Sequence, residues 1–230
     1  METIEGVVTD SFEEVPDVRI VRIKPARWLE FKPGQYFLIL IPGGESVKPY
    51  SVSSPPLNRE YLEFCVKRVG GGRASNFMFH TGKGDRLTMR GPMGRFVLQD
   101  KIENDIIFAA TGTGISAIKP MIQAVFERGT GEQIWLFFGV RTERDIIYRK
   151  EFDAIASKNR NFHFIPCLSR PSGSWSGERG YVQGAIKKLV EDARNKDVYI
   201  CGLAAMVEQM KVIAEQLGFS KDRIHFEKYV

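Results

Sequence analysis

The chain has 230 residues, of which 43% are hydrophobic and 27% are charged, and its formal net charge is +5. This composition is that of an ordinary globular protein, and the length allows one large domain or two smaller ones. The basic residues are dispersed rather than interleaved with aromatic residues in one tract, which argues against nucleic-acid binding. The longest apolar runs, such as residues 36–41, are much shorter than the roughly 20 residues that cross a bilayer, so we expect no membrane insertion.

The amino-terminal residues include acids and form no apolar signal core, which predicts a cytoplasmic protein. Cys65, Cys167 and Cys201 are far apart and form no CxxC pair, and the three histidines are not grouped. An iron–sulfur cluster usually takes four cysteine ligands, so we predict neither a cluster nor another metal site. Redox chemistry in this chain would therefore need an organic cofactor or the metal of a partner.

The first 100 residues have the pattern of β-structure. Runs of alternating or β-branched residues lie at 6–9, 18–23, 36–41, 61–69 and 86–90. Turn residues separate these runs, and only residues 73–80 look helical. Several short strands with a single helix predict a closed antiparallel barrel over residues 1–100.

The stretch KPYSVSS, residues 48–54, has two interpretations. It is either the end of a strand entering a polar turn, or a shelf for a ligand, with one aromatic ring, several hydroxyl groups and a cation. The local pattern alone leaves both open.

Residues 101–230 alternate between apolar strands and amphipathic helices. We predict strands at 106–110, 134–138, 162–168, 198–201 and 224–226, and helices at 115–126, 149–157, 182–193 and 204–217. Strands buried on both faces and alternating with helices indicate a doubly wound parallel sheet. The predicted division is thus a barrel domain at 1–100 and an α/β domain at 101–230.

Ligands of such sheets bind beyond the carboxyl ends of the strands. The first strand ends in Thr111-Gly112-Thr113-Gly114, where glycines would let backbone amides approach a phosphate at the start of a helix. Tight packing is the alternative explanation, because the spacing is not that of GxGxxG. Ser169, Arg170, Arg179 and Tyr181 follow the third strand and suit a phosphate monoester on an adenosine, or form an ordinary solvated loop.

Taken in order, the motifs resemble those of the ferredoxin–NADP reductase superfamily over essentially the whole chain. The matching segments are FKPGQY (31–36), KPYSVSS (48–54), FCVKR (64–68), GRASNF (72–77), GPMGRF (91–96), TGTGIS (111–116), FGVRTERDIIY (138–148), the set SR with RGY (169–170 and 179–181), YICG (199–202) and FEKY (226–229). The resemblance implies a Greek-key barrel that binds FAD and a sheet that binds a nicotinamide nucleotide.

The resemblance assigns flavin contacts to the barrel. Tyr50 would pack on the isoalloxazine ring, Ser51 would hydrogen-bond near flavin N5, and Ser54 would lie close by. A leading arginine that grips the flavin phosphates in the family is replaced by Lys48, which keeps the charge without the bidentate fork. The remaining flavin or cofactor-binding positions implied for the barrel are Cys65, Val66, Lys67, Gly72 and Ser75, with Lys67 reaching toward the nucleotide.

The resemblance assigns the nucleotide and the chemistry to the second domain. The pyrophosphate would face Gly112, Thr113 and Gly114, next to Thr111. The four residues Ser169, Arg170, Arg179 and Tyr181 match positions that hold the 2′-phosphate of NADPH, so we expect NADPH, with NADH as the alternative. Cys201 and Glu227 match a catalytic pair near the nicotinamide, and Ser51 acts from the flavin side.

The chain ends with Phe226-Glu227-Lys228-Tyr229-Val230. Tyr229 matches the aromatic residue that covers the flavin and must swing aside for the nicotinamide. Because Val230 follows it, the gating ring is either Tyr229 or Phe226.

The implied function is flavin-dependent NAD(P)H oxidation, with electrons passing to or from a separate carrier such as ferredoxin, flavodoxin or an oxygenase component. Two alternatives remain open: a flavin reductase that uses free flavin as a substrate, and an electron-transfer subunit of a larger complex. The sequence does not fix the electron acceptor, the direction of electron flow or the oligomeric state.

Overall fold

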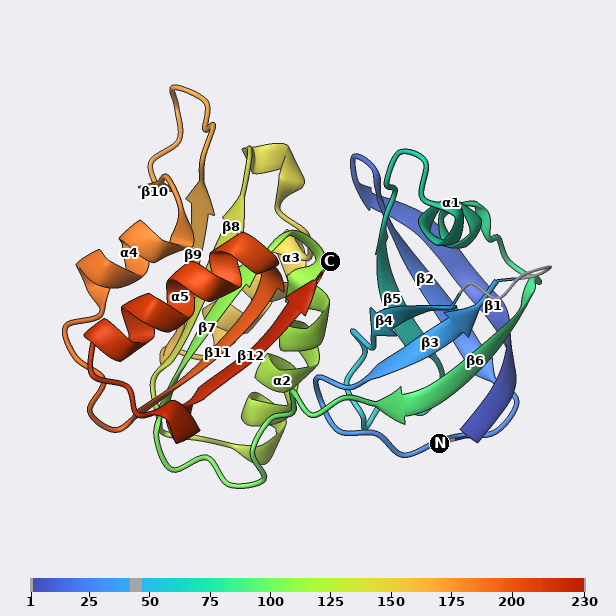
Figure 1. Cartoon of the computed structure of the whole chain (residues 1–230), viewed down its shortest axis with the longest axis horizontal. Helices are drawn as coiled ribbons and strands as arrows, with labels where there is room; N and C mark the ends of the chain where they lie inside the picture. The colour runs from blue at the N-terminus through green and yellow to red at the C-terminus, as the bar shows by residue number, and fades with distance from the viewer. Residues whose placement is uncertain (1, 42–46, 230) are drawn as a thin grey trace. The chain divides into compact units, whose positions relative to one another are not determined.

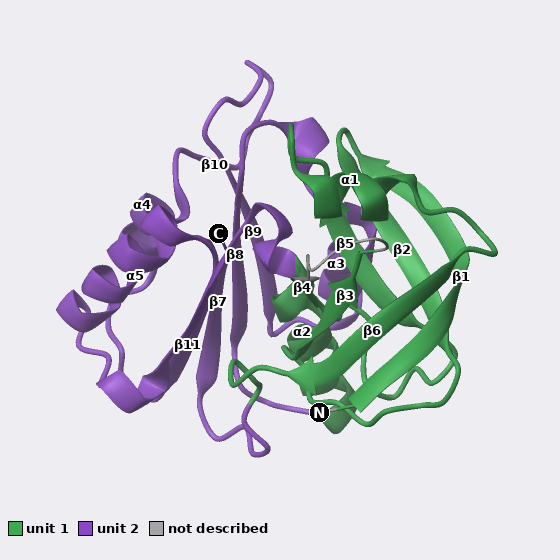
Figure 2. Ribbon diagram, turned by 45° about the vertical axis from the view of Figure 1, so that its right-hand side comes forward, with its two compact units in different colours: residues 1–98, 116–128 green, residues 99–115, 129–230 purple. Residues whose placement is uncertain are grey.

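A computed structural model of the chain describes residues 2–41 and 47–229, with only the backbone of Val47. Its contacts divide the chain into two compact units (Figure 2). The first unit comprises residues 1–98 and 116–128, and the second comprises residues 99–115 and 129–230. The predicted boundary at residue 100 separates a flavin-binding part from a nucleotide-binding part, and it stays a prediction. The contacts divide the chain differently, because they group residues 116–128 with the barrel.

The first unit is built on a six-stranded antiparallel sheet in the order β4-β3-β6-β1-β2-β5 (Figure 1). Its strands are β1 (Glu2–Val15), β2 (Val18–Pro25), β3 (Tyr36–Leu40), β4 (Val47–Ser51), β5 (Leu62–Lys67) and β6 (Arg86–Met93). A bridge between Val52, just after β4, and Phe64 of β5 connects the two edges of the sheet. The sheet therefore closes on itself, which confirms the predicted antiparallel barrel.

Every second side chain of the barrel strands points inward, and these side chains fill the interior of the barrel. In β3, Phe37 and Ile39 are fully buried while their neighbours are partly exposed, as expected for a strand with one face on the core. The helix α1 (Arg73–His80) contributes Ala74 and Met78 to the same core. β4 was not predicted as a complete strand because the KPYSVSS stretch alternates only weakly. Pro49 is tolerated because β4 is the last strand of the hydrogen-bonded order and the closing bridge lies beyond it, at Val52.

Helix α2 (Ile115–Arg128) follows the glycine turn, and its residues 116–128 belong to the first unit. Two contacts explain this grouping. The Lys119 side chain is buried in an ion pair with Glu63 of β5. Gly34, with a φ of +99°, lies so close to α2 that a Cβ atom there would be 2.3 Å from the Met121 methyl group.

The second unit contains a six-stranded parallel sheet in the order β10-β9-β8-β7-β11-β12. Its strands are β7 (Asp105–Thr111), β8 (Ile134–Val140), β9 (Phe162–Leu168), β10 (Glu178–Arg179), β11 (Lys196–Leu203) and β12 (Ile224–Tyr229), and its helices are α3 (Arg149–Lys158), α4 (Val182–Leu189) and α5 (Ala204–Gln216). Short 3-10 turns lie at η1 (Gly112–Gly114), η2 (Glu143–Asp145) and η3 (Lys221–Arg223). α4 and α5 cover one face and α3 the other (Figures 1 and 2), which confirms the doubly wound sheet.

The strand order places the switch point of the second unit between β7 and β11. From β7 the chain moves outward through β8 and β9, and it then returns to the other side of β7 with β11 and β12. Ligands of doubly wound sheets bind at such a point, beyond the carboxyl ends of the strands. The glycine turn after β7 and the end of β11 therefore lie where a nucleotide site is expected.

Candidate active site

β4 holds the aromatic residue of the KPYSVSS stretch at the edge of the barrel sheet. Tyr50 pairs with Phe37 of β3, and its ring is partly buried against the barrel core. Burial raises the pKa of Tyr50 to about 12, so its phenol is neutral at physiological pH. Ser51 is buried and Lys48 is exposed. The strand therefore leaves part of the uncharged Tyr50 ring accessible, and the exposed cation Lys48 lies two residues before it.

One serine hydroxyl bonds two residues of the loop that precedes α1. The Ser75 hydroxyl donates to the Gly72 carbonyl at 3.0 Å and accepts from the Val69 amide at 3.2 Å. A Cβ atom on Gly71, which has a φ of +75°, would have no atom of the described chain within 4 Å. Among the described residues, no side chain caps the amino terminus of α1. Uncapped N–H groups at a helix start suit an anion such as a pyrophosphate.

The predicted cofactor residues of β5 differ in exposure. Cys65 and Val66 have buried side chains, whereas Lys67 is exposed. Val66 packs in the barrel core, whereas the buried side chain of Cys65 lies on the opposite face of β5. Lys67 keeps an accessible ammonium group.

The glycines of the turn after β7 meet two different requirements. A Cβ atom on Gly114 would lie 2.4 Å from the backbone oxygen of Cys201, so only glycine lets the turn pack on β11. Gly202 has a φ of +148°, and a Cβ atom there would lie 2.2 Å from the Thr111 hydroxyl oxygen. Gly112 has a φ of +53°, and no atom of the described chain lies within 4 Å of the position of its Cβ. Tight packing thus explains Gly114, while Gly112 leaves open space above the turn.

Cys201 and Glu227 are directly opposite each other in the ladder of β11 and β12. Burial, reinforced by the Glu227 carboxyl, raises the pKa of the Cys201 thiol well above its ordinary value, although a hydrogen bond with Tyr229 acts against this. Burial also raises the pKa of Glu227 to about 7. Glu227 Oε2 is buried and has no hydrogen-bond partner among the described residues. The site thus combines a neutral thiol with a carboxyl group that titrates near neutral pH.

The two candidate gating rings lie on opposite faces of β12. Phe226 is exposed, and the Lys211 ammonium of α5 lies 4.3 Å from its ring centroid. Tyr229 is on the other face, with Glu227, and interacts with Cys201. The structure thus brings Tyr229, rather than Phe226, to the candidate catalytic pair; Val230 lies outside the described residues.

The four residues predicted for the adenosine end have different surroundings. Arg179 Nη2 donates to the Trp175 carbonyl at 2.8 Å and to the Ser172 carbonyl at 3.2 Å, so this guanidinium helps to hold its own loop. Arg170 and Tyr181 are exposed, and Ser169 is partly buried. The exposed pair is accessible to a ligand, whereas Arg179 is at least partly committed to the loop.

Comparison with known proteins identifies the family. Residues 5–98 match the oxidoreductase FAD-binding domain and residues 108–211 match the oxidoreductase NAD-binding domain. The chain is 34% identical over 208 residues to ferredoxin–NADP reductase B of Sorangium cellulosum, with 86% of this chain and 85% of that protein covered. The chain belongs to the ferredoxin–NADP reductase superfamily. As a member of this superfamily it is an oxidoreductase that binds FAD and a nicotinamide nucleotide.

Other relatives of this superfamily member are longer. The phenol 2-monooxygenase reductase component DmpP of Pseudomonas sp. (strain CF600) is 32% identical over 213 residues, which are 90% of this chain and 60% of that protein. The crystal structure of the Amycolatopsis cytochrome P450 reductase GcoB superimposes with a TM-score of 0.93 at 27% identity, covering 99% of this chain and 69% of that one. The chain thus spans about two thirds of GcoB and less of DmpP.

The residues present fit the cofactors of the ferredoxin–NADP reductase superfamily. The uncapped start of α1 suits the flavin pyrophosphate, the space above Gly112 suits that of the nucleotide, and the unpartnered oxygen of Glu227 is a polar group suited to a ligand. Lys48 departs from the family pattern by offering a point charge in place of a guanidinium fork. The roles of individual residues stay predictions.

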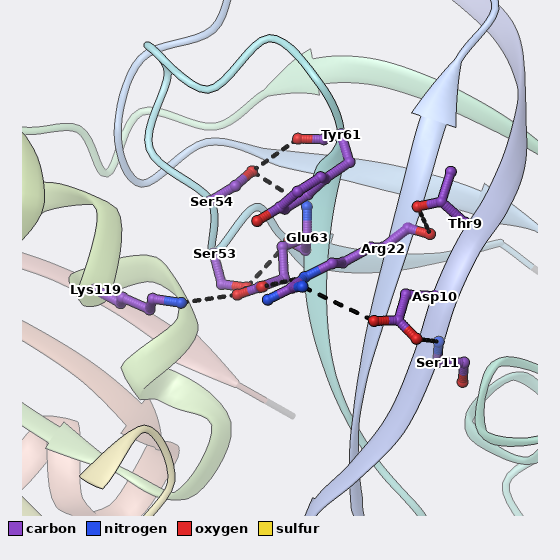
Figure 3. A network of polar contacts seen from close by, with 9 residues as sticks. All are labelled: Thr9, Asp10, Ser11, Arg22, Ser53, Ser54, Tyr61, Glu63 and Lys119. Carbon is purple, nitrogen blue, oxygen red and sulfur yellow. Dashed lines mark hydrogen bonds and ion pairs between the residues drawn. The ribbon is translucent and has the colours of Figure 1, made fainter. Parts of the chain in front are cut away.

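Sequence reasoning missed the buried charges of the first unit. Glu63 of β5 and Lys119 of α2 have side chains only 3% and 4% exposed, and their charged atoms are 2.8 Å apart (Figure 3). The available signal was a charged residue at a position where the pattern requires an apolar one: Glu63 interrupts a buried β run, and Lys119 follows Ile118 in an apolar helix segment. Ser54 belongs to this network, since its hydroxyl accepts from the Glu63 amide at 3.1 Å and donates to the Tyr61 carbonyl.

Among the helices formed by the described residues, none is long and apolar enough to cross a membrane. The same residues contain no group of three or more histidine, cysteine or acidic side chains arranged to hold a metal ion.

Proposed function

We propose that this chain oxidises NADPH with its bound FAD and passes the electrons to a separate carrier protein, such as ferredoxin, flavodoxin or an oxygenase component. The names of the relatives support a partner of this kind, since they include a ferredoxin–NADP reductase and the reductase component of a phenol monooxygenase. A cytoplasmic location, predicted from the sequence, is part of this proposal.

One observation carries the proposal: at the switch point of the sheet, the glycine turn after β7 packs on Cys201 of β11, and Cys201 pairs with Glu227 of β12, whose Oε2 atom has no partner among the described residues. A buried carboxyl oxygen without a partner, such as Glu227 Oε2, is costly for a protein to keep unless it has a function. Its pairing with Cys201, on which the glycine turn packs, supports a role for Glu227 at the nicotinamide end of the ligand.

The protein would contribute positioning and electrostatics. When bound, FAD supplies an acceptor for the hydride of the nicotinamide and releases electrons one at a time. The Cys201 thiol stays protonated and gives the nicotinamide site a neutral, water-poor wall. Ionised Glu227 would favour the positive charge that the nicotinamide ring gains when hydride leaves. Tyr229 would occupy the nicotinamide position until the nucleotide displaces it.

The preference for NADPH depends on Arg170. Its exposed guanidinium follows the end of β9, and its backbone is fixed by a hydrogen bond from its amide to the Arg141 carbonyl at 2.8 Å. A fixed backbone with an accessible fork suits a phosphate monoester. Tyr181 is 71% exposed and offers an aromatic face for an adenine ring.

A second candidate function follows from Lys48. This side chain is exposed and holds a phosphate less specifically than arginine would, which would suit a flavin reductase whose flavin dissociates as a product. Lys48→Arg should then tighten flavin binding and slow turnover with free flavin. Lys24→Arg is the matched control, since it makes the same change at an exposed lysine of the same unit that belongs to no predicted site.

Gel filtration followed by absorbance spectroscopy separates the two candidates. Stoichiometric FAD that stays with the protein and is reduced anaerobically by NADPH supports the bound-cofactor reductase. A colourless protein that reduces added free flavin in multiple turnovers supports the second candidate. A protein that neither retains nor reduces flavin contradicts both.

A further inference from the structure

In the first unit, two cationic side chains from separate elements bind the carboxylate of Glu63. Glu63 Oε1 accepts from Lys119 Nζ at 2.8 Å, and Glu63 Oε2 accepts from Arg22 Nε at 3.0 Å (Figure 3). Arg22 comes from β2, Glu63 from β5 and Lys119 from α2. We call these residues the ion triad.

The two ends of the ion triad are unequal. The Arg22 side chain is 30% exposed, lies 3.8 Å from Asp10, and its guanidinium carbon is 4.7 Å from the centroid of the Tyr61 ring. Lys119 is almost completely buried, as is Glu63. Arg22 thus holds the triad at its outer end, and Lys119 connects it to the helix at its inner end.

Stability alone is a poor explanation for the ion triad. Desolvation of buried charges offsets most of the attraction between them, and apolar replacements of similar volume are often as stable or more so. In some proteins such groups instead fix one arrangement among several, because each charge must find its partner. The useful question is therefore which segments this carboxylate holds in place.

Glu63 holds the end of the KPYSVSS stretch through both its backbone and its side chain. The Ser53 amide donates to the Glu63 carbonyl at 2.7 Å, and the Ser53 hydroxyl lies 3.1 Å from both that carbonyl oxygen and Oε1. The Glu63 amide donates to the Ser54 hydroxyl at 3.1 Å. Tyr50 and Ser51, the residues predicted to contact the flavin ring, are separated from the anchored Ser53 by Val52 alone.

The same carboxylate also anchors α2, the helix whose first residue directly follows Gly114 of the nucleotide turn. We propose that Glu63 is a positioning residue, which through Lys119 and Ser53 fixes the flavin-contacting segment 50–54 against helix α2. The inference rests on the proposed function, since it requires flavin at Tyr50 and Ser51. It adds a buried residue outside the predicted flavin contacts, which sets the position of segment 50–54 within the first unit.

The test compares charge removal in the ion triad with the same change at an exposed ion pair. Glu63→Gln removes the charge while keeping the side-chain size, Lys119→Met removes its partner, and Lys119→Arg restores the charge. Glu30→Gln is the control, because Glu30 and Arg59 form an ion pair in the same unit with side chains 70% and 67% exposed. Each variant is measured for its FAD dissociation constant, the visible circular dichroism of bound FAD, NADPH affinity and the rate of flavin reduction at saturating NADPH.

We expect Glu63→Gln and Lys119→Met to change the visible circular dichroism of FAD and to slow flavin reduction by about tenfold or more, since misplacement by 1 Å can cost ~100-fold. NADPH affinity should stay close to that of the wild type, and Lys119→Arg should recover most of the rate. Glu30→Gln should match the wild type in every measurement. A purely structural triad would instead lower thermal stability while leaving the reduction rate of the folded, flavin-loaded protein unchanged, which would overturn the proposal.

A variant pair guards against loss of folding. Glu63→Leu with Lys119→Met removes the inner charges together and leaves no unpaired carboxylate. If this double variant folds and reduces its flavin at the wild-type rate, Glu63 has no positioning role. If it folds and shows the slow rate and altered circular dichroism, the role is supported. Wild-type protein that fails to bind or reduce flavin would refute the proposed function itself, a result distinct from an active wild type with unaffected variants.

Discussion

Changing the pH between 6 and 8 should switch the charge of Glu227 in the folded protein. Burial raises the pKa of this carboxyl to about 7, and its Oε2 atom lacks a partner among the described residues. With that pKa, about 90% of the carboxyl is protonated at pH 6 and about 10% at pH 8, whereas an ordinary glutamate is ionised throughout. The carboxylate favours a positively charged nicotinamide, so the rate of flavin reduction should rise with pH across this range.

Stopped-flow reduction by saturating NADPH measures this effect directly. A charge contribution of about 1.4 kcal/mol to the transition state gives roughly a tenfold rise between the acidic and alkaline limits. Glu227→Gln should give a flat profile near the acidic limit, because the amide is neutral at every pH. A wild-type rate that is constant from pH 6 to 8, or a glutamine variant with the same inflection, would refute this reasoning.

The same ionisation has a defined effect on stability. The pKa of Glu227 is about 7 in the folded state against an ordinary value of 4.5, so the folded protein binds more protons between these values. The contribution of this group to the free energy of unfolding is therefore full below about pH 4.5 and is lost as the pH rises through 7. Glu227→Gln should remove this component from the pH dependence of urea unfolding.

Three further predictions concern the ion triad and the nucleotide site. Lys119→Met should lower the free energy of unfolding by about 3 kcal/mol and the melting temperature by roughly 6–12 °C; a loss below about 1 kcal/mol would show that Arg22 alone compensates Glu63. Arg170→Asp should reverse or erase the preference for NADPH in steady-state kinetics, and equal rates with both donors in the wild type would contradict that assignment. Tyr229→Ser should increase nicotinamide occupancy in a binding titration, whereas unchanged nucleotide affinity would argue against a gating ring.

Local patterns in the sequence were sufficient to predict both architectures. Side chains alternate in polarity in the first 100 residues, and apolar strands alternate with amphipathic helices after residue 100. These patterns indicate whether one face or both faces of a strand are buried, and they can be read directly from the residue types. Boundaries were less predictable: α4 ends at Leu189 rather than at residue 193. The strand β4 was missed as a unit because residues 48–54 alternate only weakly, and its place at the end of the strand order is revealed only by the sheet itself.

Those parts of the candidate site that lie within one short segment could be predicted from the sequence. The sequence pattern located the turn at Gly112–Gly114 and the strands that carry Cys201 and Glu227, while the catalytic pairing of these two residues was implied only by the family resemblance and stays a prediction. The ion triad was not predictable, since its members are 41 or more residues apart and become partners only through packing. Arg179 donates to the carbonyl of Trp175, only four residues away. A sequence does not show whether a guanidinium binds loop carbonyls in this way or is accessible to a phosphate.

An anaerobic titration of the purified protein with NADPH, followed by absorbance, tests the central claim most directly. The account predicts a yellow protein with one FAD per chain, whose flavin band is bleached by about one equivalent of NADPH. Protein that binds no flavin even when FAD is added, or whose bound flavin is reduced by neither NADPH nor NADH, would contradict it.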